Sequence, residues 1–439
     1  MEKIFENIPL PRSVADREYP CGDGVHMLIF GGISAEAYAS YCATLTENNF
    51  TLTDSHEIDG SKFAVFTRDG LTLAINLFGE ELRVIADKFS APVKLADPCP
   101  RTAQTTLWQH EVDHTMIDCG MCFIIRCCDG SWFIIDSGHY FQVNDNDRIH
   151  KFLRDRTPAG ERIRIAGWFI SHCHSDHVSK FCDFLRYNMD DCDLEAIYIN
   201  FPHPYPPEGA AWGKRGNNLF ILNVNEQLAE LTNIPKIKLH TGQRFAVRNL
   251  NFTVLCTHED VFPTEDTDFN NTTTVLMMEA EGSKVLFLGD ASDAESDIMV
   301  RRFGELLKCD ILQVAHHGHH GCSAELYELT RADAALFSNT QIFFDLDLEK
   351  EKEANAAILR HAKEYYISSN GTVEADLPYT SFKELPDETF EDFDKINQLW
   401  GYTYTPERKA ELYAKFLERG GKDRHPFARD PNSKGWHED

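Results

Sequence analysis

The sequence predicts a mixed α/β fold made of two or three units, and three observations lead to it. The chain has 439 residues, more than the roughly 100–200 residues of an ordinary domain. Its composition, with 42% hydrophobic and 26% charged residues, is that of a soluble globular protein. Short apolar runs with the character of strands alternate with Asp-Gly turns and helical stretches along most of the chain.

Residues 1–105 are predicted to form a small α+β accessory domain. The stretch SAEAYASYCATLTENNF, residues 34–50, has a helical pattern that ends at its two asparagines. Residues 62–78, KFAVFTRDGLTLAINLF, follow as two strands around the Asp69–Gly70 turn. The segment ADPCPR at 96–101 is predicted to be a linker, because its prolines disfavour regular structure.

Residues 106–370 are predicted to form the main domain, and residues 371–439 a polar, helix-prone C-terminal extension. The stretch CFIIRCCDGSWFIIDSG, residues 122–138, is a predicted hairpin around another Asp-Gly turn. Further apolar runs are predicted strands: 163–174, 194–201, 251–258, 272–280, 284–290 and 310–318. Helical stretches fall between some of them, at 177–189 and 293–307.

The predicted strand IRIAGWFISHCH leads directly into a cluster of potential metal ligands. Alternate residues of an extended segment point the same way, so His172 and His174 can share one ion. A turn then presents Asp176 and His177 together at a second position. Because imidazole and carboxylate are ligands of zinc and other first-row metals, this spacing favours a metal site over a histidine-rich surface loop.

Other potential ligands stand at the ends of further predicted strands. Asp136 ends the run WFIID, Asp290 ends VLFLGD, and His316 and His317 end ILQVAHH. A carboxylate that follows an apolar strand is costly to bury unless it is paired or binds a metal. These residues are therefore candidates for the same site.

The four segments, in this order, resemble the motifs of the metallo-β-lactamase fold superfamily. FIIDSG resembles the first motif, HCHSDH the H-x-H-x-D-H motif, FLGD the motif of the bridging aspartate and AHHG the last histidine motif. The resemblance covers roughly residues 110–340. Within the superfamily, FNNTTTVLMMEAEGSKVLFLGDASDAE followed by ILQVAHHGHHGCSAEL is similar to the ComEC-like branch.

This resemblance implies an αβ/βα sandwich with metals at one edge, between two β-sheets, beside the small N-terminal α+β domain. The implied ligands are His172 and His174 for the first metal, Asp176 and His177 for the second, and Asp290 as the bridge between them. His317 completes the second site if the motif glycine is Gly318, and His316 is the competing candidate. Asp136 is implied to orient the motif loop without binding a metal.

Two positions depart from the family pattern. The third histidine of the first site is replaced by Asn270 or Asn271, and His258 or His203 could take its place. The serine of the branch's H-H-G-S motif is replaced by His319. That region often contacts the substrate in the family, so the second departure bears on the choice of substrate.

The resemblance implies a hydrolase that uses two metal ions about 3.5–4 Å apart. Zinc is the expected metal, with manganese or iron as alternatives. A hydroxide that bridges the ions would attack a carbonyl or phosphoryl centre, and the residues expected to act in catalysis are Asp176, Asp290 and His319. His319 or His320 could donate a proton or bind an oxyanion. The expected substrate is a phosphoester or a similar small anionic ester. A ComEC-like nuclease, a lactone or amide hydrolase, and a non-catalytic binding module on a retired metal site are the alternatives.

Charge and hydropathy limit the classes of partner. The 43 Lys and Arg residues against 70 Asp and Glu give a net charge of −27, which repels nucleic-acid phosphates and favours a small-molecule substrate. No apolar run approaches the roughly 18 residues of a membrane span, and no secretory signal opens the chain. A cytoplasmic enzyme without a membrane partner is therefore expected, and homo-oligomerisation is left open.

The 13 cysteines are expected to be reduced thiols in that compartment. Cys119-x-x-Cys122 with Cys127 and Cys128 is interpreted as buried or half-buried thiols of the first hairpin, in preference to a zinc or redox site. Cys173 lies between two candidate ligands, but strand alternation turns it away from them.

Overall fold

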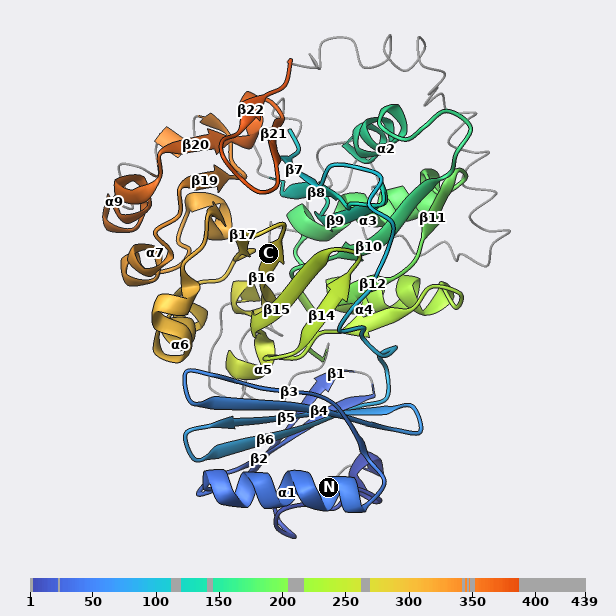
Figure 1. The fold of residues 1–439 in the computed structure, drawn as a ribbon, viewed down its shortest axis with the longest axis vertical. Helices are drawn as coiled ribbons and strands as arrows, with labels where there is room; N and C mark the ends of the chain where they lie inside the picture. The colour runs from blue at the N-terminus through green and yellow to red at the C-terminus, as the bar shows by residue number, and fades with distance from the viewer. Residues whose placement is uncertain are drawn as a thin grey trace.

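Three β-sheets and the helices that flank them form the part of the chain described by the computed structural model. The described residues are 3–22, 24–111, 120–139, 145–203, 217–261, 269–341, 344–345, 347 and 352–386. Residues 387–439 of the predicted C-terminal extension, and Cys119, lie outside them. Figure 1 shows the first sheet at one end of the molecule and the other two sheets stacked beyond it.

The first sheet is antiparallel and belongs to the N-terminal part of the chain. Its strand order is β1 (Arg17–Gly22), β2 (Val25–Phe30), β6 (Glu81–Asp87), β5 (Leu71–Phe78), β4 (Ser61–Arg68) and β3 (Thr51–Ile58). Helix α1 (Ala35–Glu47) packs on one face through Tyr38, Tyr41 and Leu45. Asp69 and Gly70 have φ angles of 50° and 77°, the left-handed pair that a tight hairpin turn requires.

The second sheet begins the sandwich. Its order is β13 (Lys236–Lys238), β12 (Ile197–Ile199), β10 (Ile163–Phe169), β9 (Trp132–Asp136), β8 (Cys122–Arg126), β7 (Thr106–Gln109), β21 (Val373–Asp376) and β22 (Lys383–Glu384), with β11 (Cys192–Leu194) also paired to β10. Because β21 pairs with β7, this sheet continues past residue 370, where the C-terminal extension was predicted to begin.

The third sheet faces the second. Its order is β14 (Arg244–Val247), β15 (Leu250–Cys256), β16 (Val275–Ala280), β17 (Ser283–Phe287), β18 (Ile311–Gln313), β19 (Ala334–Phe337) and β20 (Glu364–Ile367). One face of each sheet contributes to a shared apolar core, in which Phe133 from β9 meets Phe252 from β15 with ring centroids 4.8 Å apart.

Helices cover the outer face of each of these two sheets. Helices α2 (Asp145–Asp155), α3 (Ser175–Tyr187) and α4 (Asn217–Glu230) contribute to a second core on the outside of the second sheet. Helices α6 (Asp293–Phe303), α7 (Ala324–Thr330) and α9 (Lys352–His361) form a third core on the outside of the third sheet. The layers are therefore helix, sheet, sheet, helix, and the predicted αβ/βα sandwich with an N-terminal α+β unit is confirmed.

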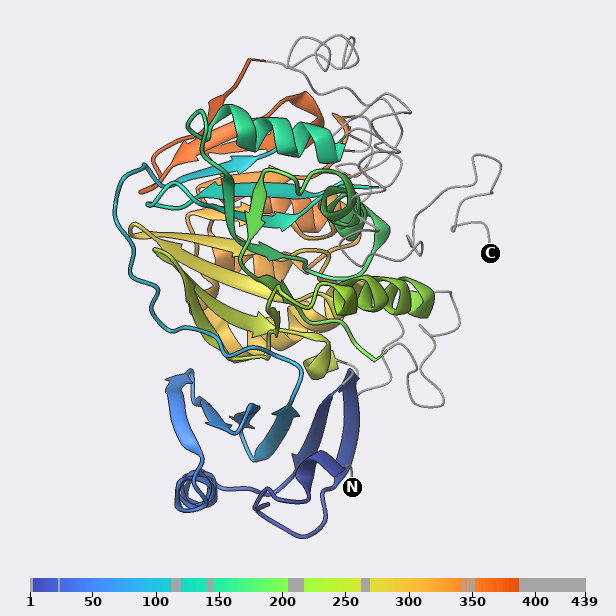
Figure 2. The same cartoon turned by 90° about the vertical axis from the view of Figure 1, so that its right-hand side faces the viewer.

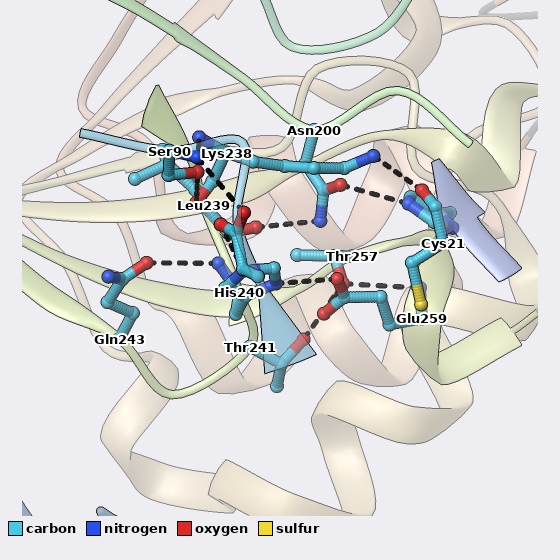
Figure 3. Close-up of polar contacts among 12 residues, drawn as sticks. Cys21, Ser90, Asn200, Lys238, Leu239, His240, Thr241, Gln243, Thr257 and Glu259 are labelled. Carbon is cyan, nitrogen blue, oxygen red and sulfur yellow. Dashed lines mark hydrogen bonds and ion pairs between the residues drawn. The ribbon is translucent and has the colours of Figure 1, made fainter. Parts of the chain in front are cut away.

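The N-terminal sheet docks on the sandwich through buried charged side chains. Arg83 Nη1 lies 2.8 Å from Asp260 Oδ1, and His240 Nε2 lies 3.1 Å from Asp87 Oδ2. The other imidazole nitrogen of His240 contacts Glu259 at 2.7 Å, a pair visible in Figure 3. Buried charges are stable only when paired, so each unit supplies partners for buried charges of the other.

A buried lysine makes a second part of this interface. The ammonium group of Lys238 donates to the backbone carbonyls of Cys21 and Phe201, and Figure 3 shows it reaching from β13 towards β1. Gly22 makes room for it, because a Cβ built there would lie 2.1 Å from Lys238 Nζ. None of the helices in the described residues is both long and apolar enough to cross a membrane.

The charged partners of His240 at this interface predict that the free energy of unfolding depends on pH. Burial alone would lower the pKa of His240, but Glu259 and Asp87 raise it to about 9. This folded-state pKa exceeds the roughly 6.5 of an unfolded histidine. The stabilisation is therefore complete below about pH 6.5 and is lost as the pH rises through about 9, a change on the order of 3 kcal/mol.

The free energy of unfolding, measured by denaturant titration at several pH values, should fall across this window in the wild type. The fall should be smaller in His240→Gln, which cannot titrate there. An equal fall in both proteins would show that His240 is not its source.

Candidate metal centre

The candidate metal centre lies where four strands end at one edge of the sandwich. Strands β9 and β10 run parallel in the second sheet, and β17 and β18 run parallel in the third. Carboxyl ends of parallel strands meet at one sheet edge, where ligands commonly bind. The backbone N–H of Thr274 donates to the carbonyl of Ser171 at 2.8 Å and ties the two sheets together there.

Two overlapping groups of ligand-type side chains meet at this edge. The first group is Asp176, His177, Asp290 and His317, and the second is His172, His174 and Asp290. Within each group the ligand atoms all lie within 4.8 Å of one another. Asp290 belongs to both groups, so its carboxylate stands between two positions that could each hold an ion.

The individual distances show that the side chains converge. His317 Nε2 lies 3.0 Å from Asp176 Oδ2 and 3.5 Å from Asp290 Oδ2. His177 Nε2 lies 3.1 Å from Asp290 Oδ1. On the other side, His172 Nε2 lies 3.8 Å from Asp290 Oδ2 and 3.0 Å from His174 Nδ1.

The chemistry of these residues fits a pair of divalent ions. His177 Nε2 and Asp290 Oδ1 are buried and make no hydrogen bond, although they face each other at 3.1 Å. Buried polar atoms almost always have a partner. Imidazole nitrogen and carboxylate oxygen are the atoms that zinc, manganese and iron take from proteins. The two atoms are therefore positioned for metal ions.

The electrostatics of the cluster favour bound cations. Burial would raise the pKa of Asp290, but His177 and His317 hold it well below its ordinary value. Burial likewise opposes a charged His177, yet Asp290, Asp136 and Asp176 raise its pKa to about 10. These carboxylates would equally attract a metal ion, which would displace the proton from His177 on binding. Burial lowers the pKa of His172 well below the ordinary value, so that imidazole stays neutral, the form that binds metals.

Asp136 holds one of these imidazoles in place from behind. Its backbone is left-handed, with φ 55°. Its carboxylate accepts from the N–H and the hydroxyl of Ser171 at 2.7 and 2.8 Å and contacts His177 Nδ1 at 2.8 Å. With Nδ1 occupied, the second nitrogen of His177 is directed at Asp176 and Asp290.

The turn after β18 separates the two adjacent histidines. His316, His317 and Gly318 have φ angles of 48°, 59° and 88°, so they form a left-handed turn and do not continue the strand. His317 Nδ1 donates to the carbonyl of Ser338 at 2.7 Å, which leaves Nε2 for the cluster. His316 instead contacts the carbonyl of His320 at 2.8 Å.

The substituted region beside the first group is built differently from the expected histidine site. Asn270 Nδ2 lies 3.3 Å from His316 Nε2, and the Phe269 ring lies 4.8 Å from that of His174. Asn271 accepts from Ser292 at 2.8 Å. An amide and an aromatic ring therefore stand near the place of the third histidine.

His258 does not fill that place. Its Nε2 pairs with Asn200 Oδ1 at 2.9 Å, and its ring lies 6.2 Å from that of Tyr19 in the N-terminal sheet. Within the described part of the chain, neither His258 nor His203 belongs to any group of potential metal ligands. His258 therefore stands apart from the candidate ligands, because it faces the interface between the two units.

His319 lies beside the cluster and has a partner that the sequence did not indicate. Its Nδ1 lies 2.5 Å from Asp347 Oδ2, and its ring centroid lies 6.2 Å from that of His317. His320 is exposed. Ser171, which contacts Asp136, was also missed, since a serine next to a histidine carries no signal of its own.

Comparison with known proteins is limited to distant likenesses. No family model matches the sequence, and no curated protein matches it. Among solved structures, the metallo-beta-lactamase fold protein YhfI from Bacillus subtilis is 12% identical with a TM-score of 0.39, covering 62% of this chain and 100% of that one. Igni18, a metallo hydrolase from Ignicoccus hospitalis, is 14% identical with a TM-score of 0.36, covering 62% and 100%.

A third solved structure is CmlA from Streptomyces venezuelae, a diiron beta-hydroxylase. It is 12% identical with a TM-score of 0.38, and the match covers 64% of this chain and 55% of that one. At these TM-scores the likenesses add nothing to the assignment of the fold. The assignment rests on the strand order and layers of this chain.

The cysteines singled out in the sequence are core residues where the structure describes them. Cys122, Cys127, Cys128 and Cys173 are buried free thiols. Cys173 packs in the core outside the second sheet, as strand alternation predicted, and takes no part in the cluster of ligand atoms.

Asp136→Asn is expected to weaken metal binding at the position that includes His177 by about 10–100-fold, the usual cost of losing a partner behind a ligand. The amide keeps the shape of the side chain but can no longer accept at both oxygens, so the orientation of His177 is lost. Metal titration followed by competition with a chelator would measure the change. Asp59→Asn, on an exposed turn, is the control, and equal affinities in both variants would contradict the role.

Proposed function

We propose that this chain is a metal-dependent hydrolase that binds two divalent ions and acts on a phosphoester or a similar small anionic ester. The observation that carries the proposal is the position of Asp290, whose carboxylate belongs to both groups of ligand atoms. Zinc is the metal proposed, with manganese or iron as alternatives. Two such ions, when bound, lower the pKa of water towards ~7 and polarise a carbonyl or phosphoryl oxygen.

Each of the two proposed metal positions has its own set of side chains. Asp176, His177 and His317 would hold one ion, and His172 and His174 would hold the other. Asp290 fixes the spacing of the two positions, since it is held between His177 and His317. The burial of the cluster excludes bulk water and strengthens the attraction between the ions and an anionic substrate.

His319 is proposed to contact the substrate. It stands beside His317 and is fixed by Asp347, so it offers an oriented side chain at the edge of the metal cluster. The surface charge supports a small substrate, because a net charge of −27 opposes the approach of a nucleic acid. This disfavours the ComEC-like nuclease.

The first test is elemental analysis of the purified full-length protein for zinc, manganese and iron. About two ions per chain are expected, as in other two-metal sites. No metal, even after reconstitution, would contradict the proposal. One ion per chain would contradict the two-ion form of the proposal, and would agree with the replacement of the third histidine by Asn270.

The second test is a substrate panel with the metal-loaded protein. Phosphomonoesters, phosphodiesters, lactones and β-lactams would be compared with and without a chelator. Chelator-sensitive hydrolysis of phosphoesters is expected. Hydrolysis confined to lactones or β-lactams would overturn the substrate class, and tight metal binding without any turnover would favour a non-catalytic binding module.

A further inference from the structure

Two cysteine thiols from separate segments touch each other far along the chain from the metal ligands. Cys99 lies in the segment that connects the N-terminal sheet to the sandwich, and Cys128 lies in the turn between β8 and β9. Their sulfur atoms are 3.4 Å apart. A disulfide has an S–S bond of about 2.05 Å, so these are two thiols in contact that need a shift of little more than an ångström to bond.

The backbone holds Cys128 in place. Its carbonyl accepts from the N–H groups of Thr102 and Ala103 at 2.7 and 2.8 Å, and its own N–H donates to Asn249 Oδ1 at 2.8 Å. Thr102 and Ala103 follow Cys99 closely in the connecting segment, so the same contacts hold the neighbourhood of Cys99 against the turn.

The connecting segment is also held in place on the other side of Cys99. Asp97 Oδ2 accepts from Arg248 Nη1 at 2.7 Å and from the backbone N–H of Arg248 at 2.9 Å. Figure 2 shows this segment running along the side of the sandwich, away from the N-terminal sheet. Two thiols held in this way react with each other at a high effective concentration.

Access distinguishes Cys99 from most other thiols. Among the cysteines in the described residues, only Cys42 and Cys99 are half-buried, and the others are buried. A small oxidant can therefore reach Cys99 first. A metal site is not indicated, because neither Cys99 nor Cys128 belongs to any group of three potential ligands in the described residues.

We propose that Cys99 and Cys128 are a reversible redox pair that forms an intramolecular disulfide with a low-molecular-weight disulfide, such as oxidised glutathione, as the oxidant. This revises the interpretation of Cys128 as a thiol without redox chemistry. The proposal does not depend on the metal centre or on hydrolysis.

The exchange balances in two steps. The Cys99 thiolate attacks one sulfur of oxidised glutathione and expels a glutathione thiolate, giving a mixed disulfide. The Cys128 thiolate then attacks Cys99 Sγ and expels the second glutathione. Two protein thiols lose two protons and two electrons, and the oxidant becomes two thiols. Burial raises the pKa of Cys99 to about 11, so the first step should be slow at neutral pH and faster in alkali.

The product would tie the connecting segment covalently to the sandwich. With both thiols reduced, the connecting segment is joined to the sandwich through hydrogen bonds at Thr102 and Ala103 and through the Asp97–Arg248 pair. The disulfide would close a loop between residues 99 and 128 and limit how far the N-terminal sheet can move from the sandwich.

The test uses the full-length protein in glutathione buffers of increasing oxidised fraction. After trapping of the remaining thiols, peptide mapping should find one linked pair, Cys99 with Cys128, and the intact mass before trapping should fall by about 2 Da. Excess reduced glutathione should reverse the change. Mapping of the wild type alone decides the matter, even if a variant does not fold.

Three variants sharpen the result. Cys128→Ser should stop the reaction at glutathione bound to Cys99, and Cys99→Ser should show neither linkage nor glutathione at Cys128. Cys42→Ser is the matched control and should form the Cys99–Cys128 link as the wild type does. Glutathione remaining on Cys99 of the wild type, or no linked peptide at any buffer ratio, would overturn the proposal.

Discussion

Asp290→Asn is expected to release both metal ions and to abolish hydrolysis, with a loss of rate well beyond the 10–100-fold that follows removal of a partner behind a ligand. The carboxylate is 1% exposed and belongs to both groups of ligand atoms. The asparagine keeps the shape of the side chain but removes the charge that would serve both ions. No other side chain of the described residues is shared by the two groups.

Elemental analysis and rate measurement on the same sample would check this result. The variant should keep its fold, because His177 retains Asp136 as a partner at 2.8 Å. Circular dichroism and the thermal midpoint would confirm this. Asp293→Asn, an exposed acidic residue three positions away, is the control. Two ions per chain or wild-type turnover in Asp290→Asn would show that the shared carboxylate is not the bridge.

The sequence was informative where local chemistry decides the structure. An apolar strand that ends in His172, His174 and Asp176 has few explanations, because histidine and carboxylate side chains rarely gather after a buried strand without a ligand. The alternation of strands with helices and Asp-Gly turns likewise indicated the layers of the fold. Each of these signals lies within a few residues of the feature that it predicts.

Features that depend on distant segments were not predictable in this way. Asp347 reaches His319 from 28 positions later in the chain, and no local pattern marks it. His258 lies away from the candidate ligands because it packs near Tyr19 in another sheet. The contact of Cys99 with Cys128 joins the turn of the hairpin to a separate connecting segment, so alternation within the hairpin could not reveal it.

The adjacent pair after β18 shows where a local rule was insufficient. If strand β18 continued through His316 and His317, their side chains would point to opposite faces of the sheet. The two residues instead form a left-handed turn. Gly318 is required there, since a Cβ would lie 2.9 Å from the Phe337 ring at a φ of 88°. A positive φ in three successive residues is a consequence of packing between β18 and β19, which one strand alone does not specify.

His317→Ala is expected to empty the metal position that it shares with Asp176 and His177, and to lower the rate more than any change at His316. His317 Nε2 is directed at Asp176 and Asp290, and its Nδ1 is fixed on the carbonyl of Ser338. Loss of this imidazole removes one ligand from a buried site. An exposed side chain cannot reach this site to replace it.

His316→Ala is expected to keep both ions and to lower the rate by at most about 10–100-fold. His316 contacts Asn270 and the carbonyl of His320, and it is absent from both groups of ligand atoms. The two variants are matched, because both residues have left-handed backbones and an alanine is strained to a similar degree at either place. Their difference therefore reports on the side chains.

Metal content and rate, measured together on both variants and on Glu325→Ala as the exposed control, would decide the assignment. His317→Ala is expected to lose metal, and His316→Ala and Glu325→Ala are expected to keep nearly the metal content of the wild type. If His316→Ala loses one ion while His317→Ala keeps two, the ligand is His316. In that case Asn270, whose Nδ2 lies 3.3 Å from His316 Nε2, would contact a metal ligand directly.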